Sequence, residues 1–112
     1  MAEIKYMVDG VYIKDFGKLA EDVAVGCGAE IVAVERISNG AVVCLEKYFF
    51  RKEGYTALTI IVENESERSR ATIIGSGGGE GFFNISYGTN SDFVNSAAEA
   101  LYSCYEFGYK KE

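Results

Sequence analysis

Apolar and polar residues alternate in the first part of the chain, which is typical of a strand with one buried face. Ile4, Tyr6 and Val8 are the apolar positions of this strand. Asp9-Gly10 follows them and is a turn signal. The pattern therefore predicts a half-buried strand that ends at Asp9-Gly10.

The spacing then becomes helical, because apolar residues recur at every third or fourth position. These positions are Tyr12, Phe16, Leu19, Ala20, Val23 and Ala24. Asp9 or Asp15 is expected to cap the helix, since a carboxylate accepts hydrogen bonds from the first amide groups. Gly26-Cys27-Gly28 is expected to end it, because glycine suits the left-handed conformation that follows a last helical turn.

Two apolar runs, 30–37 and 41–50, flank Ser38-Asn39-Gly40 and predict a hairpin. Asn-Gly pairs are common in two-residue hairpin turns because both residues tolerate positive φ. With the Asn-Gly pair as the turn, Ile37 lies opposite Val42.

Neither face of this hairpin is uniformly polar, although an antiparallel sheet with one solvated face normally alternates strictly. One face carries Ile31, Ala33, Glu35, Ile37, Val42, Cys44, Glu46 and Tyr48, and the other carries Val32, Val34, Arg36, Val43, Leu45 and Lys47. Three explanations are open. The register is wrong, or both faces are partly covered in the middle of a sheet, or helices cover one face and a partner chain covers the other.

Two further strands are predicted, one at 56–62, where β-branched residues dominate, and one at 68–74, where Ala71 and Ile73 alternate with Arg70, Thr72 and Ile74. The charged segment 63–67 joins them as a hairpin loop. A glycine-rich stretch at 75–81 interrupts the second strand, and a further short strand is possible at 82–87.

A second helix is expected to start near Thr89, because Thr89 and Asp92 have the spacing of a capping box. Its apolar stripe is Phe93, Ala97, Leu101, Cys104 and Tyr105. Gly108 is the expected stop.

Residues 1–112 are therefore expected to form a single α+β domain. Strands grouped between two helices are typical of an antiparallel sheet with helices packed on one face. The predicted order is one strand, a helix, four or five strands and a second helix, with five or six strands in the sheet.

The 17 acidic and 11 basic residues give a net charge of −6. We expect neither a nucleic acid nor an anionic membrane as a partner, because binding to phosphates needs clustered Lys and Arg. The first residues do not resemble a signal peptide, and no apolar run approaches the ~20 residues that span a bilayer. We expect a cytoplasmic protein.

The residues that usually carry catalysis are poorly represented. The chain has no histidine, which is the commonest general base and metal ligand. Cys27, Cys44 and Cys104 are widely spaced and are expected to be reduced and mostly buried. The spacing of Glu46, Glu80 and Asp92 gives no reason to bring these carboxylates together. We therefore expect no metal, no cofactor and no enzymatic activity.

The glycine-rich stretch is the most distinctive segment of the chain. A phosphate-binding loop would need a lysine and a following helix, whereas Glu80 and Phe82-Phe83 follow here. One interpretation is a β-bulge or turn where backbones approach closely. The other is the rim of a ligand pocket, and its candidate binding residues are Ser76, Gly77, Gly78, Gly79, Glu80 and Gly81.

The segment Gly75-Ser76-Gly77-Gly78-Gly79 with Phe82-Phe83, followed by Asp92-Phe93, resembles a family of short bacterial proteins of unknown function. The likeness extends to Glu46-Lys47-Tyr48 and to 58–62. The resemblance implies a small cytoplasmic protein that consists of one domain. It brings no activity and no catalytic residues.

The sequence thus predicts a non-enzymatic binding or interaction module. The two-faced apolar hairpin and the aromatic run Tyr48-Phe49-Phe50 favour self-association through the sheet, most simply as a homodimer. The alternative is a small-molecule-binding domain with its pocket near 75–81.

Overall fold

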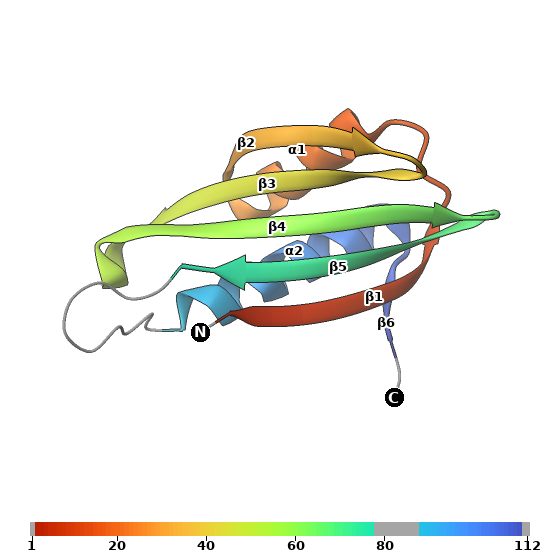
Figure 1. Ribbon diagram of the computed structural model, residues 1–112. Helices are drawn as coiled ribbons and strands as arrows, with labels where there is room; N and C mark the ends of the chain where they lie inside the picture. Colours follow the sequence, from red (N-terminus) through yellow and green to blue (C-terminus); the bar gives the residue numbers. More distant parts are fainter. Residues whose placement is uncertain (1, 78–87, 111–112) are drawn as a thin grey trace.

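The computed structural model describes residues 2–77 and 88–110 (Figure 1). Its elements are β1 (Glu3–Val11), α1 (Phe16–Cys27), β2 (Glu30–Ile37), β3 (Gly40–Phe49), the short 3₁₀ helix η1 (Phe50–Lys52), β4 (Gly54–Glu65), β5 (Arg68–Ser76), α2 (Thr89–Tyr105) and β6 (Gly108–Tyr109). Strands β1 and β6, near the two ends of the described chain, lie side by side at one edge of the sheet.

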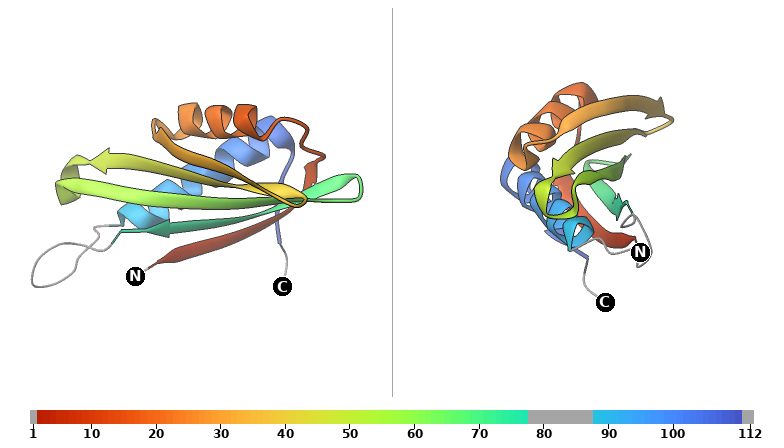
Figure 2. Two further views of the ribbon diagram at one scale, coloured as in Figure 1. Left: turned by 45° about the horizontal axis from the view of Figure 1, so that its top comes forward. Right: turned by 90° about the vertical axis from the view of Figure 1, so that its left-hand side faces the viewer.

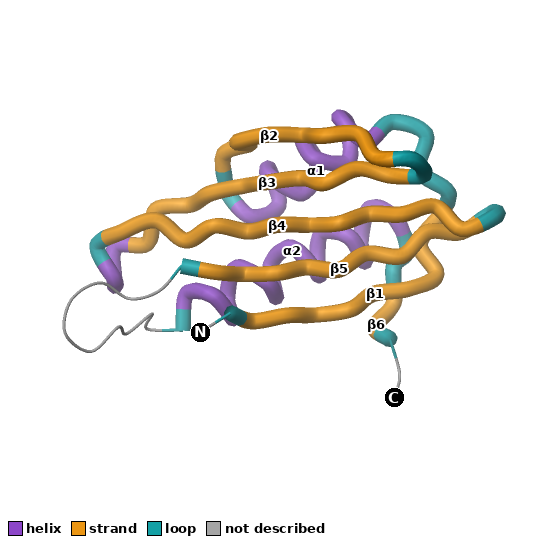
Figure 3. Tube along the Cα trace, in the orientation of Figure 1, coloured by secondary structure: helices purple, strands orange, loops and turns teal. Residues whose placement is uncertain are grey.

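The strands form one sheet in the order β2-β3-β4-β5-β1-β6, and every neighbouring pair is antiparallel (Figure 3). Both helices pack on the same face of this sheet, as the turned views show (Figure 2). The predicted α+β class is confirmed, with its order of elements and its two helices on one face. β6 is a short addition after α2, and the possible strand at 82–87 lies outside the described residues.

Helix α1 has an N-cap and a C-cap that are among the residues predicted for these positions. The Asp15 side chain accepts a hydrogen bond from the Lys18 amide, at 3.0 Å, and so satisfies one of the first free N–H groups. Gly28 ends the helix in the left-handed conformation, with φ 65°. The prediction that Tyr12 belongs to the apolar stripe is wrong, because this residue precedes the helix and is half exposed.

Strand β1 does not end at Asp9-Gly10 as predicted. Asp9 has φ 61°, and the pairing with β5 moves from Met7–Ala71 to Gly10–Ser69. Three steps along β1 thus match two along β5, which is a β-bulge. A single residue with positive φ has bent the strand without terminating it.

The predicted register of the β2–β3 hairpin is wrong by two positions. Ile37 pairs with Gly40 and Glu35 with Val42, so the turn is Ser38-Asn39. Gly40 is glycine for a different reason: a Cβ there would lie 1.8 Å from the carbonyl oxygen of Val62 on β4. Close approach between backbones, rather than the turn, requires this glycine.

Helix α2 starts at the predicted residue but is capped differently. Gly88, with φ 77°, is the N-cap, and no side chain caps the helix. The expected capping box is therefore not formed. Thr89 instead accepts a hydrogen bond from the Thr56 hydroxyl at 2.9 Å, which ties the first turn of α2 to β4. The helix ends at Tyr105 with Glu106, at φ 64°, as its C-cap, and the predicted stop, Gly108, belongs to β6.

The core lies between the helices and one face of the sheet. Its largest fully buried side chains are Phe93, Phe107, Met7, Leu19, Leu45, Leu58, Ile60, Ile73 and Leu101. Gly75 lets α2 approach β5, because a Cβ there would lie 2.6 Å from Val94 Cγ2 and 2.8 Å from the Asn90 carbonyl oxygen. Strands β1, β3, β4 and β5 thus each have one face buried against the helices, whereas no residue of β2 is fully buried.

Candidate functional site

The face of the sheet that carries no helix faces the viewer in Figure 1. We call it the open face. Its side chains alternate along each strand with the buried core positions. They are Ile4 and Tyr6 on β1, Ala33 and Glu35 on β2, Val42, Cys44, Glu46 and Tyr48 on β3, Tyr55, Ala57, Thr59, Ile61 and Glu63 on β4, and Arg70, Thr72 and Ile74 on β5.

Two rows of side chains cross the open face from β2 to β1. The first row is Glu35, Val42, Ile61, Thr72 and Tyr6, and the second is Ala33, Cys44, Thr59, Ile74 and Ile4. Nine of these ten positions are Ile, Val, Ala, Cys, Thr or Tyr, and the exception is Glu35 on the edge strand β2. Ile4 is 49% exposed and Tyr6 is 54% exposed. The two rows form one apolar band across five strands.

The wrong hairpin register does not explain this band. A shift by two positions leaves each side chain on its original face, because the side-chain period of a strand is two. The apolar residues at 42 and 44 therefore face away from the helices in either register. Of the explanations that the sequence left open, helices do cover one face, and the second face keeps its apolar side chains.

Charged side chains border the band on both sides. Glu35 lies at the β2 end of the first row. At the β1 end, the Lys110 ammonium lies 6.0 Å from the centre of the Tyr6 ring. A hollow of about 460 Å³ follows Tyr6 and Thr72 toward Arg70, which forms ion pairs with Glu63 and Glu65. The first row thus begins at a carboxylate and ends at an ammonium group.

An aromatic cluster extends the open face toward η1. Tyr48 pairs with Tyr55 across β3 and β4, with ring centres 5.4 Å apart. Phe50 contacts Tyr48 edge to face at 5.2 Å and is 86% exposed. Phe49 points to the other side of the sheet and packs on Phe93 of α2. Exposed aromatic residues of this kind are enriched at protein interfaces.

The two edges of the sheet are less suited to association than its face. β2 carries a register shift between Ile31 and Ala33, and Glu35 and Arg36 lie near its end. Bulges and charges on edge strands hinder pairing with another chain. β6 has only two residues. The open face is therefore the candidate functional site.

The cysteines differ in environment, and the expectation that they are mostly buried holds for one of them. Cys27, the last residue of α1, is buried, and burial raises the pKa of its thiol to about 11, although the nearby Lys47 ammonium opposes this shift. Cys44 is partly exposed on the open face, and Cys104 is exposed on α2. A neutral, buried thiol such as Cys27 is a poor nucleophile.

Only part of the predicted glycine-rich site lies in the described residues. Ser76 ends β5 and is exposed. Gly77 has φ 152°, and a Cβ there would lie 3.1 Å from Thr56 Cα. Gly78, Gly79, Glu80 and Gly81 lie outside the described residues, so ligand binding by this stretch stays a prediction.

Two of the three carboxylates considered in the sequence, Glu46 and Asp92, lie apart. Glu46 lies on the open face, whereas Asp92 lies in the first turn of α2, on the other side of the sheet, and pairs with Arg51. Glu80 lies outside the described residues. Within 2–77 and 88–110, no group of acidic or cysteine side chains has the arrangement of a metal site. None of the helices in these ranges is long and apolar enough to cross a bilayer.

A comparison with protein-family models adds one identification to this geometry. A model for a family of unknown function, DUF6054, matches residues 1–105. The chain belongs to this family. Searches of curated proteins and of solved structures found no match to this DUF6054 protein.

Sequence reasoning missed two parts of the surface of the DUF6054 protein. The place of Lys110 beside Tyr6 depends on β6, a two-residue strand with no periodic pattern. A polar cavity at the hairpin end of the sheet combines three loops that are distant in sequence. The excess of polar and turn residues in these loops was visible, but their convergence was not.

Proposed function

We propose that this protein is a non-enzymatic interaction module that forms a homodimer through the open face of its sheet. The observation that carries the proposal is the apolar band, which crosses five strands on the face without helices. Burial of such a band is favourable by roughly 25 cal/mol per Å² of apolar surface. A cytoplasmic location is part of the proposal.

The size of the open face suits a stable interface. β4 has 12 residues, so at about 3.3 Å per residue it extends for roughly 40 Å. Five strands about 4.8 Å apart span roughly 24 Å. The other four strands have 8 to 10 residues, so the face offers roughly 750 Å², close to the ~800 Å² per partner of a standard stable complex.

The borders of the band favour a second copy of the chain as the occupant. A twofold axis along β4 would place β3 of one copy over β5 of the other, and β2 over β1. Glu35 at one end of the first row would then approach Lys110 of the second copy at the other end. Two sheets that pack in this aligned way are separated by ~10 Å. Self-complementarity of this kind is what a twofold interface requires.

The test compares variants by size-exclusion chromatography with light scattering. Ile61 is central in the first row, and Ile61→Glu should raise the dimer dissociation constant about tenfold or more, because a charge would be buried without a partner. Val25→Glu is the matched control, since Val25 is 83% exposed on α1, away from the open face. A wild-type protein that is monomeric throughout, or an Ile61→Glu variant that dimerises as the wild type does, would refute the proposal.

A charge exchange tests the direction of the axis. Glu35→Lys and Lys110→Glu should each weaken the dimer, because each brings like charges together. The double variant should recover most of the wild-type affinity. If the double variant is weaker than either single variant, the two residues do not face each other and this arrangement is wrong.

A further inference from the structure

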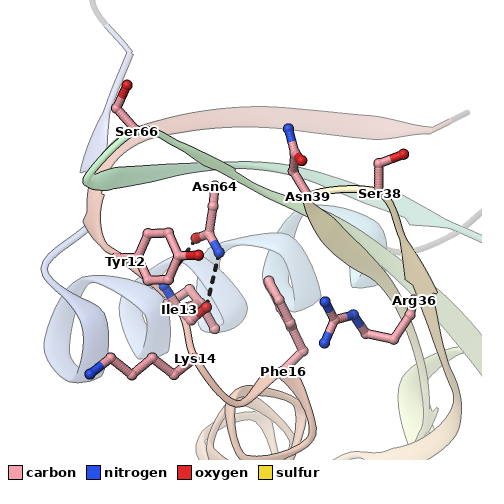
Figure 4. A pocket seen from close by; sticks show the side chains of 9 residues that line it. All are labelled: Tyr12, Ile13, Lys14, Phe16, Arg36, Ser38, Asn39, Asn64 and Ser66. Atoms are coloured by element: carbon pink, nitrogen blue, oxygen red, sulfur yellow. Dashed lines mark hydrogen bonds between the residues drawn. The ribbon is translucent and has the colours of Figure 1, made fainter.

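Three loops at one end of the sheet enclose a cavity of about 470 Å³ (Figure 4). They are the connection from β1 to α1, the β2–β3 turn, and the end of the β4–β5 hairpin. Ligand pockets in proteins commonly have volumes of about 300–1,000 Å³. The cavity lies at the opposite end of β5 from Ser76, so it is separate from the glycine-rich stretch.

Arg36 is held in this cavity by two contacts. Its Nε donates a hydrogen bond to the Gly40 carbonyl oxygen at 3.2 Å. Its guanidinium carbon lies 4.8 Å from the centre of the ring of Phe16, which is buried. These contacts orient the planar guanidinium group while its two terminal nitrogens still carry their N–H donors. A planar pair of donors matches a carboxylate or a phosphate.

Tyr12 and Lys14 add polar groups from the other wall. Figure 4 shows the Tyr12 hydroxyl directed toward the interior of the cavity from the side opposite Arg36. Lys14 lines the same wall, and Figure 4 shows its ammonium group extending outward, away from Arg36. The backbone beneath them is fixed by Asn64, whose side chain accepts from the Ile13 amide at 3.0 Å and donates to its carbonyl at 2.9 Å. Tyr12 and Lys14 thus belong to a loop whose backbone is held in place by two hydrogen bonds.

The charge of the lining is opposite to that of the protein. The chain has 17 acidic residues and a net charge of −6, yet the described lining residues include two cations and no carboxylate. Without such a local arrangement, the net charge would repel anions. The charge of the lining residues therefore favours the binding of an anion.

We propose that this cavity binds a small organic anion. Arg36 holds its carboxylate or phosphate group through two N–H donors, the Tyr12 hydroxyl donates a further hydrogen bond, and Lys14 adds attraction at the rim. The exposed Tyr12 ring offers an apolar wall to the rest of the molecule. This site is independent of self-association through the open face.

The test is an NMR titration of the full chain with inorganic phosphate and with benzoate, against sodium chloride at equal ionic strength. Saturable changes in the amide signals of 12–16, 36–39 and 64–66 are expected with one probe or both, and the tighter probe identifies the preferred group. Arg36→Met should weaken binding about tenfold or more. Arg36→Lys should bind with intermediate affinity, because a lysine keeps the charge but not the planar pair of donors.

Arg68→Met is the matched control, since Arg68 is exposed on β5 and does not line the cavity. This variant should bind as the wild type does. Tyr12→Phe tests the same site without altering Arg36. This variant should weaken binding about threefold to tenfold, because the hydrogen bond from the Tyr12 hydroxyl to the anion is lost. The proposal is overturned if neither probe saturates beyond chloride, or if Arg36→Met and Tyr12→Phe both bind like the wild type.

Discussion

The side chain of Asn64 on β4 pairs with the backbone of Ile13 as a neighbouring strand would. Its Oδ1 accepts from the Ile13 amide at 3.0 Å, and its Nδ2 donates to the Ile13 carbonyl at 2.9 Å. The chain between β1 and α1 thus has no strand beside it, but one side chain satisfies both of its backbone groups. Unpaired backbone groups at a partly buried site would otherwise carry a free-energy cost.

Asn64→Ala should therefore lower the free energy of unfolding by roughly 2 kcal/mol, about 1 kcal/mol for each lost hydrogen bond. Asn64→Asp should recover only part of this loss, because a carboxylate accepts from the Ile13 amide but cannot donate to its carbonyl. Urea denaturation measures both effects. Asn39→Ala is the control, since Asn39 contributes its backbone oxygen to Asn64; an equal loss in this variant would contradict the assigned role of the Asn64 side chain.

Gly75 is expected to tolerate no side chain, because α2 packs directly onto it. In Gly75→Ala the new methyl group would meet Val94 Cγ2 at 2.6 Å and the Asn90 carbonyl oxygen at 2.8 Å. Overpacking of this kind costs about 1–3 kcal/mol. Gly54→Ala is the matched control, since its nearest contact would be at 3.6 Å, an ordinary distance. The thermal stabilities of the two variants should differ clearly, and similar values would show that α2 can move away from β5.

The contact between Asp22 of α1 and Tyr105 of α2 should make stability depend on pH. The hydrogen bond from the Tyr105 hydroxyl, and then that from Lys18, lower the pKa of the Asp22 carboxyl below its ordinary range. A lowered pKa in the folded state contributes stability that is present above the unfolded pKa, near 4, and is lost as the pH falls through the folded value. Tyr105→Phe should therefore show a smaller loss of stability between about pH 5 and pH 3 than the wild type.

The same pair acts in the opposite direction at high pH. Burial, and then the hydrogen bond to Asp22, raise the pKa of Tyr105 above its ordinary range. The neutral phenol is favoured in the folded protein, so its contribution is complete below about pH 10 and is lost as the pH rises further. Tyr102→Phe is the control, because Tyr102 is an exposed tyrosine on the same helix. If Tyr102→Phe and Tyr105→Phe have the same pH profile, the contact with Asp22 has no such effect.

Local chemistry in the sequence predicted most of the fold. The Asp15 cap, Gly28, and the apolar periods of α1, β4 and β5 each follow from short-range rules, and each is found. The wrong predictions concern two residues, Gly40 and Asp9, whose roles depend on a neighbouring strand. Gly40 was assigned to a turn but admits the Val62 backbone, and Asp9 was assigned to a strand end but forms a bulge.

The candidate site was predicted less completely, because surfaces depend on which strands become neighbours. The two-faced hairpin indicated that its second face is apolar. It could not show that β1 joins the sheet beside β5, which extends the band to Tyr6 and Ile4. The cavity around Arg36 needs three turns to meet at one end of the sheet. Such long-range placement leaves no periodic signal in the sequence.

The rate at which Cys44 reacts with N-ethylmaleimide, measured by mass spectrometry at increasing protein concentration, tests the use of the open face most directly. Cys44 lies in the second row of the band, whereas Cys104 is exposed on α2 and serves as the internal reference. We expect the labelling of Cys44 to slow about tenfold between roughly 1 and 100 µM protein, as the dimer forms, while Cys104 reacts at a constant rate. A rate ratio for Cys44 and Cys104 that does not change with concentration would contradict the proposed interface.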